Sequence, residues 1–204
     1  MTEHSKEELV GYWNALKDQV ISVNASFEIY KVLGLGGHFD AMKAAPAFFT
    51  IVMRSLLNNT IIGLSKIYEK KGRSFGNLQN LLFISESNIF YYGLHSTTGS
   101  VISENIKKQN MNIIECEQMI KDLMHWRDKA FAHNDKAYLT GIEQLAKDTN
   151  FTLSSIRKLI EIAWSIIEAN ILALTGNKVD IKIPNGLDVN ELLEILYDQS
   201  SMSG

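Results

Sequence analysis

Apolar residues recur at steps of three and four along most of this 204-residue chain, which is the spacing of one face of an α-helix. The clearest run extends from Leu9 to Tyr30, and Ser5 followed by Glu8 has capping-box spacing at its start. Only two prolines occur in the sequence, so little interrupts such a pattern. These features predict an all-α protein, built as a single up-and-down helical bundle of four to five main helices with short accessory helices.

The glycine, proline and capping residues between the apolar runs predict where the helices begin and end. The first run should end near Gly34, and a second helix should extend from about Pro46 to about Lys71. A short helix and an irregular loop are expected over 74–99, followed by helices over about 112–133, 152–176 and 189–197. We expect one domain over residues 1–204, in which the residues after about 180 form a C-terminal arm or a short helix.

Composition and charge exclude several classes of protein. The net charge of −3 argues against broad, sequence-independent coating of nucleic acid, and a single cysteine excludes an intrachain disulfide and a zinc site built from thiolates. The two most apolar segments, 44–64 and 159–174, contain charged and amide side chains that are costly in a bilayer. We therefore expect a cytoplasmic protein that holds no metal and no cofactor and has no membrane partner.

A basic cluster marks the end of the predicted second helix. It consists of Lys66, Lys70, Lys71 and Arg73. Positive charges at a helix C-terminus are favoured by the helix dipole, which is the simpler interpretation. The alternative is a patch that contacts phosphate groups and steers RNA.

The segment HWRDKAFAHND, residues 125–135, holds the strongest candidates for a functional site. Arg127 falls on the same helical row as the apolar residues Cys116, Ile120 and Leu123. A guanidinium in such a row must be paired with a carboxylate, bound to an anion or placed at a subunit interface, because an unpaired buried charge is costly. His133 lies six residues further on and is not stacked on Arg127 in a regular helix.

These residues also carry a family resemblance. Arg127, the polar Asp128, four further residues and His133 resemble the Arg-polar-x-His signature of the HEPN superfamily. The following Asn134 and Asp135, together with the upstream segment LLNNTIIGLSKIYEKKGRS, resemble its bacterial abortive-infection branch of the AbiU type.

The resemblance implies a homodimer that lines a cleft with two copies of the motif and acts as a metal-independent endoribonuclease of the abortive-infection or toxin type, used in phage defence. Arg127 would then hold the scissile phosphate, His133 would be the general acid or base, and Asp128 would orient one of them. An antitoxin protein is a further expected partner. Asp135 stands where members regulated by a nucleotidyltransferase antitoxin often carry tyrosine, so that form of regulation is not predicted.

Other interpretations stay open beside this one. Arg127 could form a structural ion pair with an acidic side chain of a neighbouring helix, and the chain could be a non-catalytic helical module for dimerisation or for binding nucleotide, RNA or protein. His125 is expected to be a surface histidine rather than the titrating group. The aromatic run at Phe90, Tyr91 and Tyr92 is expected to pack in the bundle, with stacking on a base as the alternative.

Overall fold

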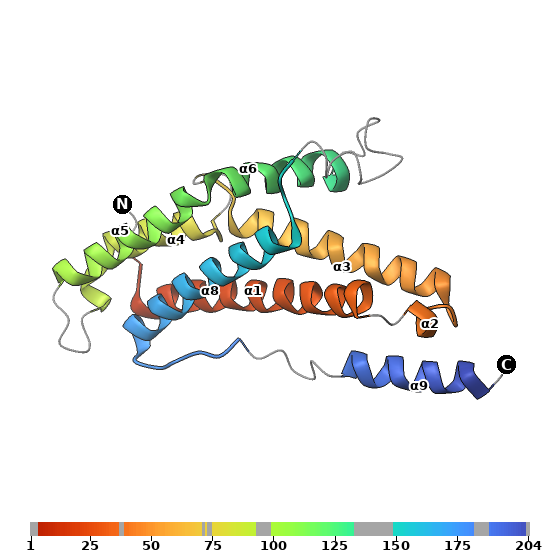
Figure 1. Cartoon of the computed structure of the whole chain (residues 1–204). Helices are drawn as coiled ribbons and strands as arrows, with labels where there is room; N and C mark the ends of the chain where they lie inside the picture. The colour runs from red at the N-terminus through yellow and green to blue at the C-terminus, as the bar shows by residue number, and fades with distance from the viewer. Residues whose placement is uncertain are drawn as a thin grey trace. The chain divides into compact units, whose positions relative to one another are not determined.

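A computed structural model describes residues 4–36, 39–70, 72, 75–92, 99–132, 149–181 and 188–202. Its main helices are α1 (Lys6–Leu35), α3 (Pro46–Ile67), α4 (Leu78–Ser87), α5 (Gly99–Glu115), α6 (Glu117–Trp126), α8 (Leu153–Thr175) and α9 (Asp188–Met202) (Figure 1). Shorter pieces are α2 (Phe39–Met42), the 3₁₀ turn η1 (Ile89–Tyr92) and the π-helical turn η2 (Arg127–Ala132). No strand occurs among these residues, and the predicted all-α class is confirmed.

The contacts within the chain group into two units. One unit comprises 1–20 and 61–181, and the other comprises 21–60 and 182–204, so α1 and α3 each contribute residues to both. The expectation of a single domain over residues 1–204 therefore stays a prediction. Arg127 and Asp128 belong to the larger unit.

The larger unit is held by helices whose apolar faces are buried. In α8 the predicted cap is present: the Thr152 side chain accepts a hydrogen bond from the Ser155 backbone, and Gly176 ends the helix with a positive φ of 76°. Between these caps Leu159, Ala163, Ile166 and Leu174 are fully buried, among others. The first turn of α1 likewise has its predicted capping box, with reciprocal bonds between Ser5 and Glu8. Local sequence signals thus fixed the ends of these helices.

A buried polar cluster joins α1, α4 and η1 in the same unit. The Trp13 indole N–H lies 3.3 Å from Ser85 Oγ and 3.2 Å from the Tyr92 hydroxyl oxygen. The Tyr92 hydroxyl also donates to Ser85. The residues of the aromatic run thus differ in burial: Tyr92 packs in the core as expected, whereas Phe90 is 62% exposed.

The smaller unit has its own apolar cluster, formed by Leu33, Ala41, Phe49 and Leu193. Leu193 is fully buried and comes from α9, which packs against α2. The C-terminal segment that the sequence left open between an arm and a short helix is thus helical over Asp188–Met202.

Helix α3 is long and apolar enough to cross a membrane by length and composition, and 28% of its most apolar stretch is buried. Phe49, Leu57 and Leu64 are buried whereas Phe48 and Ile51 are exposed, so it serves as a core helix on one face. It also ends at Ile67, earlier than the predicted Lys71. The chain then turns through Glu69, whose N–H bonds the Lys66 carbonyl three residues back.

The prediction of a helix beginning near Asn112 was wrong. Helix α5 already begins at Gly99, and Asn112 lies in its interior, where no cap is needed. The interruption comes instead at Cys116, whose φ of −96° and ψ of 9° end α5 and start α6. The Cys116 side chain is buried, as its place on the apolar row predicted.

Candidate functional site

The residues around Arg127 lie where the regular helix α6 changes its winding. The Arg127 backbone N–H still bonds the carbonyls of Leu123 and Met124, and the six residues Arg127–Ala132 form a π-helical turn. Such turns insert a residue into a helix and are frequent at functional sites, because they redirect the side chains that follow. No sequence pattern predicted this turn.

Trp126 fixes the end of α6 next to this turn. Its indole N–H donates to Thr149 Oγ1 at 2.8 Å, and its ring lies 5.7 Å from the Phe151 ring, centre to centre. Trp126 and Phe151 are both buried. Because Arg127 is the next residue, the segment before α8 holds the backbone of the arginine in place.

Arg127 lies between two carboxylates. Its Nε and one terminal nitrogen, Nη2, each lie 2.7 Å from Asp128 Oδ1. The other terminal nitrogen, Nη1, lies 3.9 Å from Glu69 Oε1, which is beyond hydrogen-bond distance. The Arg127 and Glu69 side chains are about one-fifth exposed, at 20% and 21%, and Asp128 is 46% exposed. The guanidinium is thus paired and is also reached by solvent.

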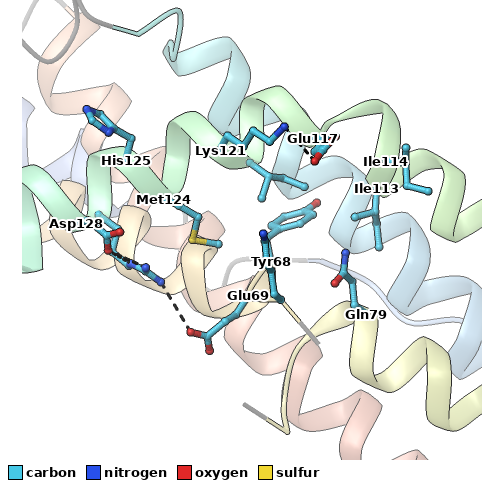
Figure 2. A pocket seen from close by; sticks show the side chains of 13 residues that line it. Tyr68, Glu69, Gln79, Ile113, Ile114, Glu117, Lys121, Met124, His125 and Asp128 are labelled. Carbon is cyan, nitrogen blue, oxygen red and sulfur yellow. Dashed lines mark hydrogen bonds and ion pairs between the residues drawn. The ribbon is translucent and has the colours of Figure 1, made fainter. Parts of the chain in front are cut away.

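The Arg127 and Asp128 pair forms one end of an open pocket of about 580 Å³ (Figure 2). The residues that follow α3, the first turn of α4, the last turn of α5, α6 and the start of η2 supply its walls. Its lining residues are Tyr68, Glu69, Lys70, Gln79, Ile113, Ile114, Glu117, Ile120, Lys121, Met124, His125, Arg127 and Asp128. This volume falls within the range of about 300 to 1,000 Å³ typical of ligand sites.

The structure brings together some of the predicted site residues. Arg127 and Asp128 are in contact, and Lys70 lines the same pocket, whereas Lys66 is exposed and is not part of its lining. The predictions for His133, Asn134, Asp135, Lys71 and Arg73 lie outside the described residues. The roles assigned to all of these residues stay predictions.

Sequence reasoning missed four polar residues of the pocket, which are Glu69, Gln79, Glu117 and Lys121. His125, expected at the surface, is half-buried and part of the lining, although Figure 2 shows its ring turned away from Met124 and Tyr68. His125 lies three residues before Asp128, and this spacing places two side chains on the same face of a helix, which could have indicated that His125 lies near Asp128. Glu69 and Gln79 come from segments far away in the sequence and gave no such signal.

Tyr68 closes the pocket at its base and is 3% exposed. Its hydroxyl donates a 2.6 Å hydrogen bond to the Leu159 carbonyl of α8. Burial, and secondarily the nearby Cys116, raises the pKa of Tyr68 well above its usual value of 10.0. Burial also raises the pKa of the Cys116 thiol, which disfavours a nucleophilic thiolate there.

The raised Tyr68 pKa predicts how stability depends on alkaline pH. A group with a raised folded-state pKa stabilises the fold fully below its unfolded pKa of 10.0, and this contribution is lost as pH rises towards the folded value. Tyr68→Phe should cost about 1 kcal/mol at pH 8, through the lost hydrogen bond. It should then lose less stability than wild type between pH 8 and pH 11 in urea unfolding, and equal losses in both proteins would contradict this.

No group of three or more histidine, cysteine or carboxylate side chains that could hold a metal ion occurs in the part of the chain that the structure describes. The chemistry available at the pocket is that of an arginine held by carboxylates, a histidine and two lysines. Such groups can bind an anion.

Comparison with known families gives one match. The family model HEPN_AbiU2, described as AbiU2, matches residues 6–198, which is nearly the whole chain and includes Arg127, Asp128 and His133. No curated protein and no solved structure matches the chain.

Proposed function

The chain belongs to the AbiU2 family of HEPN domains, and on that premise we propose that it is a metal-independent endoribonuclease of the abortive-infection type. It acts in the cytoplasm as a homodimeric toxin in phage defence, and an antitoxin protein restrains it. Membership of the family supports an abortive-infection module. The nuclease activity, the dimer and the location are proposals.

The proposal is supported chiefly by the way Asp128 holds the Arg127 guanidinium at the pocket. Asp128 binds two of its nitrogens on one side and so fixes the plane of the guanidinium. Its third nitrogen, Nη1, lies 3.9 Å from Oε1 of Glu69, which also lines the pocket, and a phosphate oxygen could replace this long contact. A planar, permanently charged group held in this way suits the charge that develops on phosphorus during RNA cleavage.

The reaction requires one base and one acid. The base removes the proton of the 2′-hydroxyl, whose oxygen attacks phosphorus, and the bond from phosphorus to the 5′-oxygen breaks as the acid protonates that oxygen. The products are a 2′,3′-cyclic phosphate and a 5′-hydroxyl end. We assign the proton transfer to His133, and a homodimer supplies a second copy for the opposite step. Arg127 stabilises the phosphate, and Asp128 orients Arg127.

A cleavage assay tests this proposal. Purified protein is incubated with total RNA in EDTA, and discrete cleavage products ending in 2′,3′-cyclic phosphate are expected. His133→Ala should slow cleavage by about 10²-fold to 10⁴-fold, the usual contribution of general acid–base catalysis. His125→Ala is the matched control, since it removes the other histidine of the segment 125–135, and it should stay within a few-fold of wild type.

Two results would overturn the assignment. Cleavage that disappears in EDTA and returns with Mg²⁺ would exclude a metal-independent reaction. Loss of cleavage in His125→Ala but not in His133→Ala would move the acid–base role to the residue that lines the pocket.

The second candidate function is a non-catalytic binding module. The observation that favours it is the pairing of Arg127 with Asp128 and Glu69, because a structural ion pair would have the same geometry. In that case wild type and His133→Ala would leave RNA equally intact in the assay above.

A further inference from the structure

Most of the pocket beside Arg127 is not used by the proposed chemistry. From the Arg127 and Asp128 end it continues past Met124 and Tyr68 towards Ile113 and Gln79 (Figure 2). A phosphate held by Arg127 would occupy only the first part of this space. The remaining volume is large enough to hold a further part of a ligand.

The floor of this remaining part is apolar. Ile113 and Tyr68 are each 3% exposed, and Ile120 and Met124 are half-buried beside them. Ile114, 57% exposed, lies at the rim. Apolar contacts to the ring faces are part of how an unstacked nucleobase is recognised, and a thioether such as that of Met124 makes favourable contacts with an aromatic ring.

The charges of the pocket argue against a second phosphate in this part. Lys121 and Glu117 form an ion pair of 3.1 Å on adjacent turns of α6. Three positive and three negative side chains line the pocket, and their formal charges cancel. The positive ones are Lys70, Lys121 and Arg127, and the negative ones are Glu69, Glu117 and Asp128. A part of the pocket without excess charge fits a nucleotide that places its base there and its phosphate at the Arg127 guanidinium.

Gln79 supplies polar recognition at the far end. It comes from the first turn of α4 and lines the pocket opposite the Arg127 end (Figure 2). A side-chain amide has both donor and acceptor atoms and can therefore match a base edge. Stacking on the floor would give affinity for any base, and the amide would give preference among bases.

We propose that this part of the pocket, defined by Tyr68, Gln79, Ile113, Ile120 and Met124, is a subsite for one nucleobase of the RNA next to the phosphate held by Arg127. The position of that phosphate rests on the proposed function, whereas binding of the base does not require cleavage. The subsite selects the nucleotide at which RNA is held.

Calorimetric titration tests the subsite directly. The full-length protein is titrated with 5′-AMP, 5′-UMP and ribose 5-phosphate, which lacks the base. At least one mononucleotide should bind about tenfold more tightly than ribose 5-phosphate, in line with the usual effect of stacking one base. A six-residue RNA of the preferred base should bind more tightly still, since the neighbouring nucleotides add contacts.

Met124→Trp should fill the subsite and abolish the advantage of the mononucleotide over ribose 5-phosphate. Met111→Trp is the matched control, because Met111 is 53% exposed on α5 and does not line the pocket. Gln79→Leu is the second variant, should Met124→Trp fail to fold; it keeps the size of the side chain and should reduce the difference in affinity between 5′-AMP and 5′-UMP.

Several results would overturn the subsite. Equal affinity for ribose 5-phosphate and both mononucleotides, or no binding of any of the three, would exclude base recognition. Wild-type binding by folded Met124→Trp, or an unchanged base preference in Gln79→Leu, would place recognition elsewhere. A mononucleotide that binds as tightly as the six-residue RNA would identify the ligand as a free nucleotide and not RNA.

The outcomes separate this inference from the proposed function. RNA cleavage in EDTA without any base-dependent binding would retain the enzyme and exclude the subsite. Base-dependent binding that Met124→Trp abolishes, in a protein that leaves RNA intact, would retain the subsite and exclude the nuclease.

Discussion

Arg127→Lys is expected to reduce RNA cleavage about 100-fold or more, nearly as much as Arg127→Ala, as is usual when one group that stabilises the transition state is lost. Arg127 uses two nitrogens on Asp128 and presents a third to the pocket. A lysine has a single charged nitrogen, which cannot bind Asp128 in this way and also reach the phosphate. The initial rate of cleavage of one short RNA, measured in EDTA, gives the comparison.

Two control variants make this result interpretable. Lys121→Ala removes a positive charge from the same pocket, but Lys121 is 59% exposed and paired with Glu117, so cleavage should change only a few-fold. Asp128→Asn keeps the shape of the orienting side chain and removes its charge, so its rate should fall between wild type and Arg127→Lys. A rate for Arg127→Lys close to that of wild type would show that a point charge suffices and that the fixed fork has no role.

Trp13→Ala should lower the free energy of unfolding by about 3 to 5 kcal/mol, the usual cost of removing a buried aromatic side chain. Trp13 is 1% exposed, and its indole N–H bonds to Ser85 and Tyr92, so the substitution leaves a cavity and removes their shared partner. Trp13→Phe keeps most of the buried area and should cost less, about 1 to 3 kcal/mol. Urea unfolding followed by circular dichroism measures both values.

The control for this prediction is Phe90→Ala. Phe90 is also aromatic and lies in η1, beside Tyr92, but its 62% exposure should keep the change within about 0.5 kcal/mol. If Trp13→Ala cost no more than Phe90→Ala, the buried cluster of Trp13, Ser85 and Tyr92 would not be the contact that joins α1 to α4.

The fold class and several helix ends could be predicted because their signals are local. Ser5 and Glu8 at the start of α1, and Thr152 and Gly176 at the ends of α8, act on backbone groups a few residues away. The wrong prediction of a helix start at Asn112 also arose from a local signal. A capping spacing occurred there by chance inside α5, while the real interruption at Cys116 has no side-chain cap.

The candidate site could be predicted only in part. The motif placed Arg127 and Asp128 together because they are adjacent in the sequence, and the family match over 6–198 confirms the HEPN resemblance. The π-helical turn after Trp126 was not predicted, and the contacts beside it, from Trp126 to Thr149 and Phe151, join segments that are distant in the sequence. His125 was assigned to the surface for a similar reason, since its burial depends on its neighbours in space.

The sequence alone determined the all-α class, the capped ends of α1 and α8, and which arginine is the candidate for binding phosphate, because hydrophobic periodicity and capping act over short distances along the chain. Only the tertiary structure decided what surrounds that arginine. Glu69 and Gln79 reach the pocket because the end of α3 and the start of α4 lie beside α6, and such contacts depend on packing between distant segments. The charge of Arg127 could be read from the sequence, but the carboxylates and the apolar floor beside it arise from the fold.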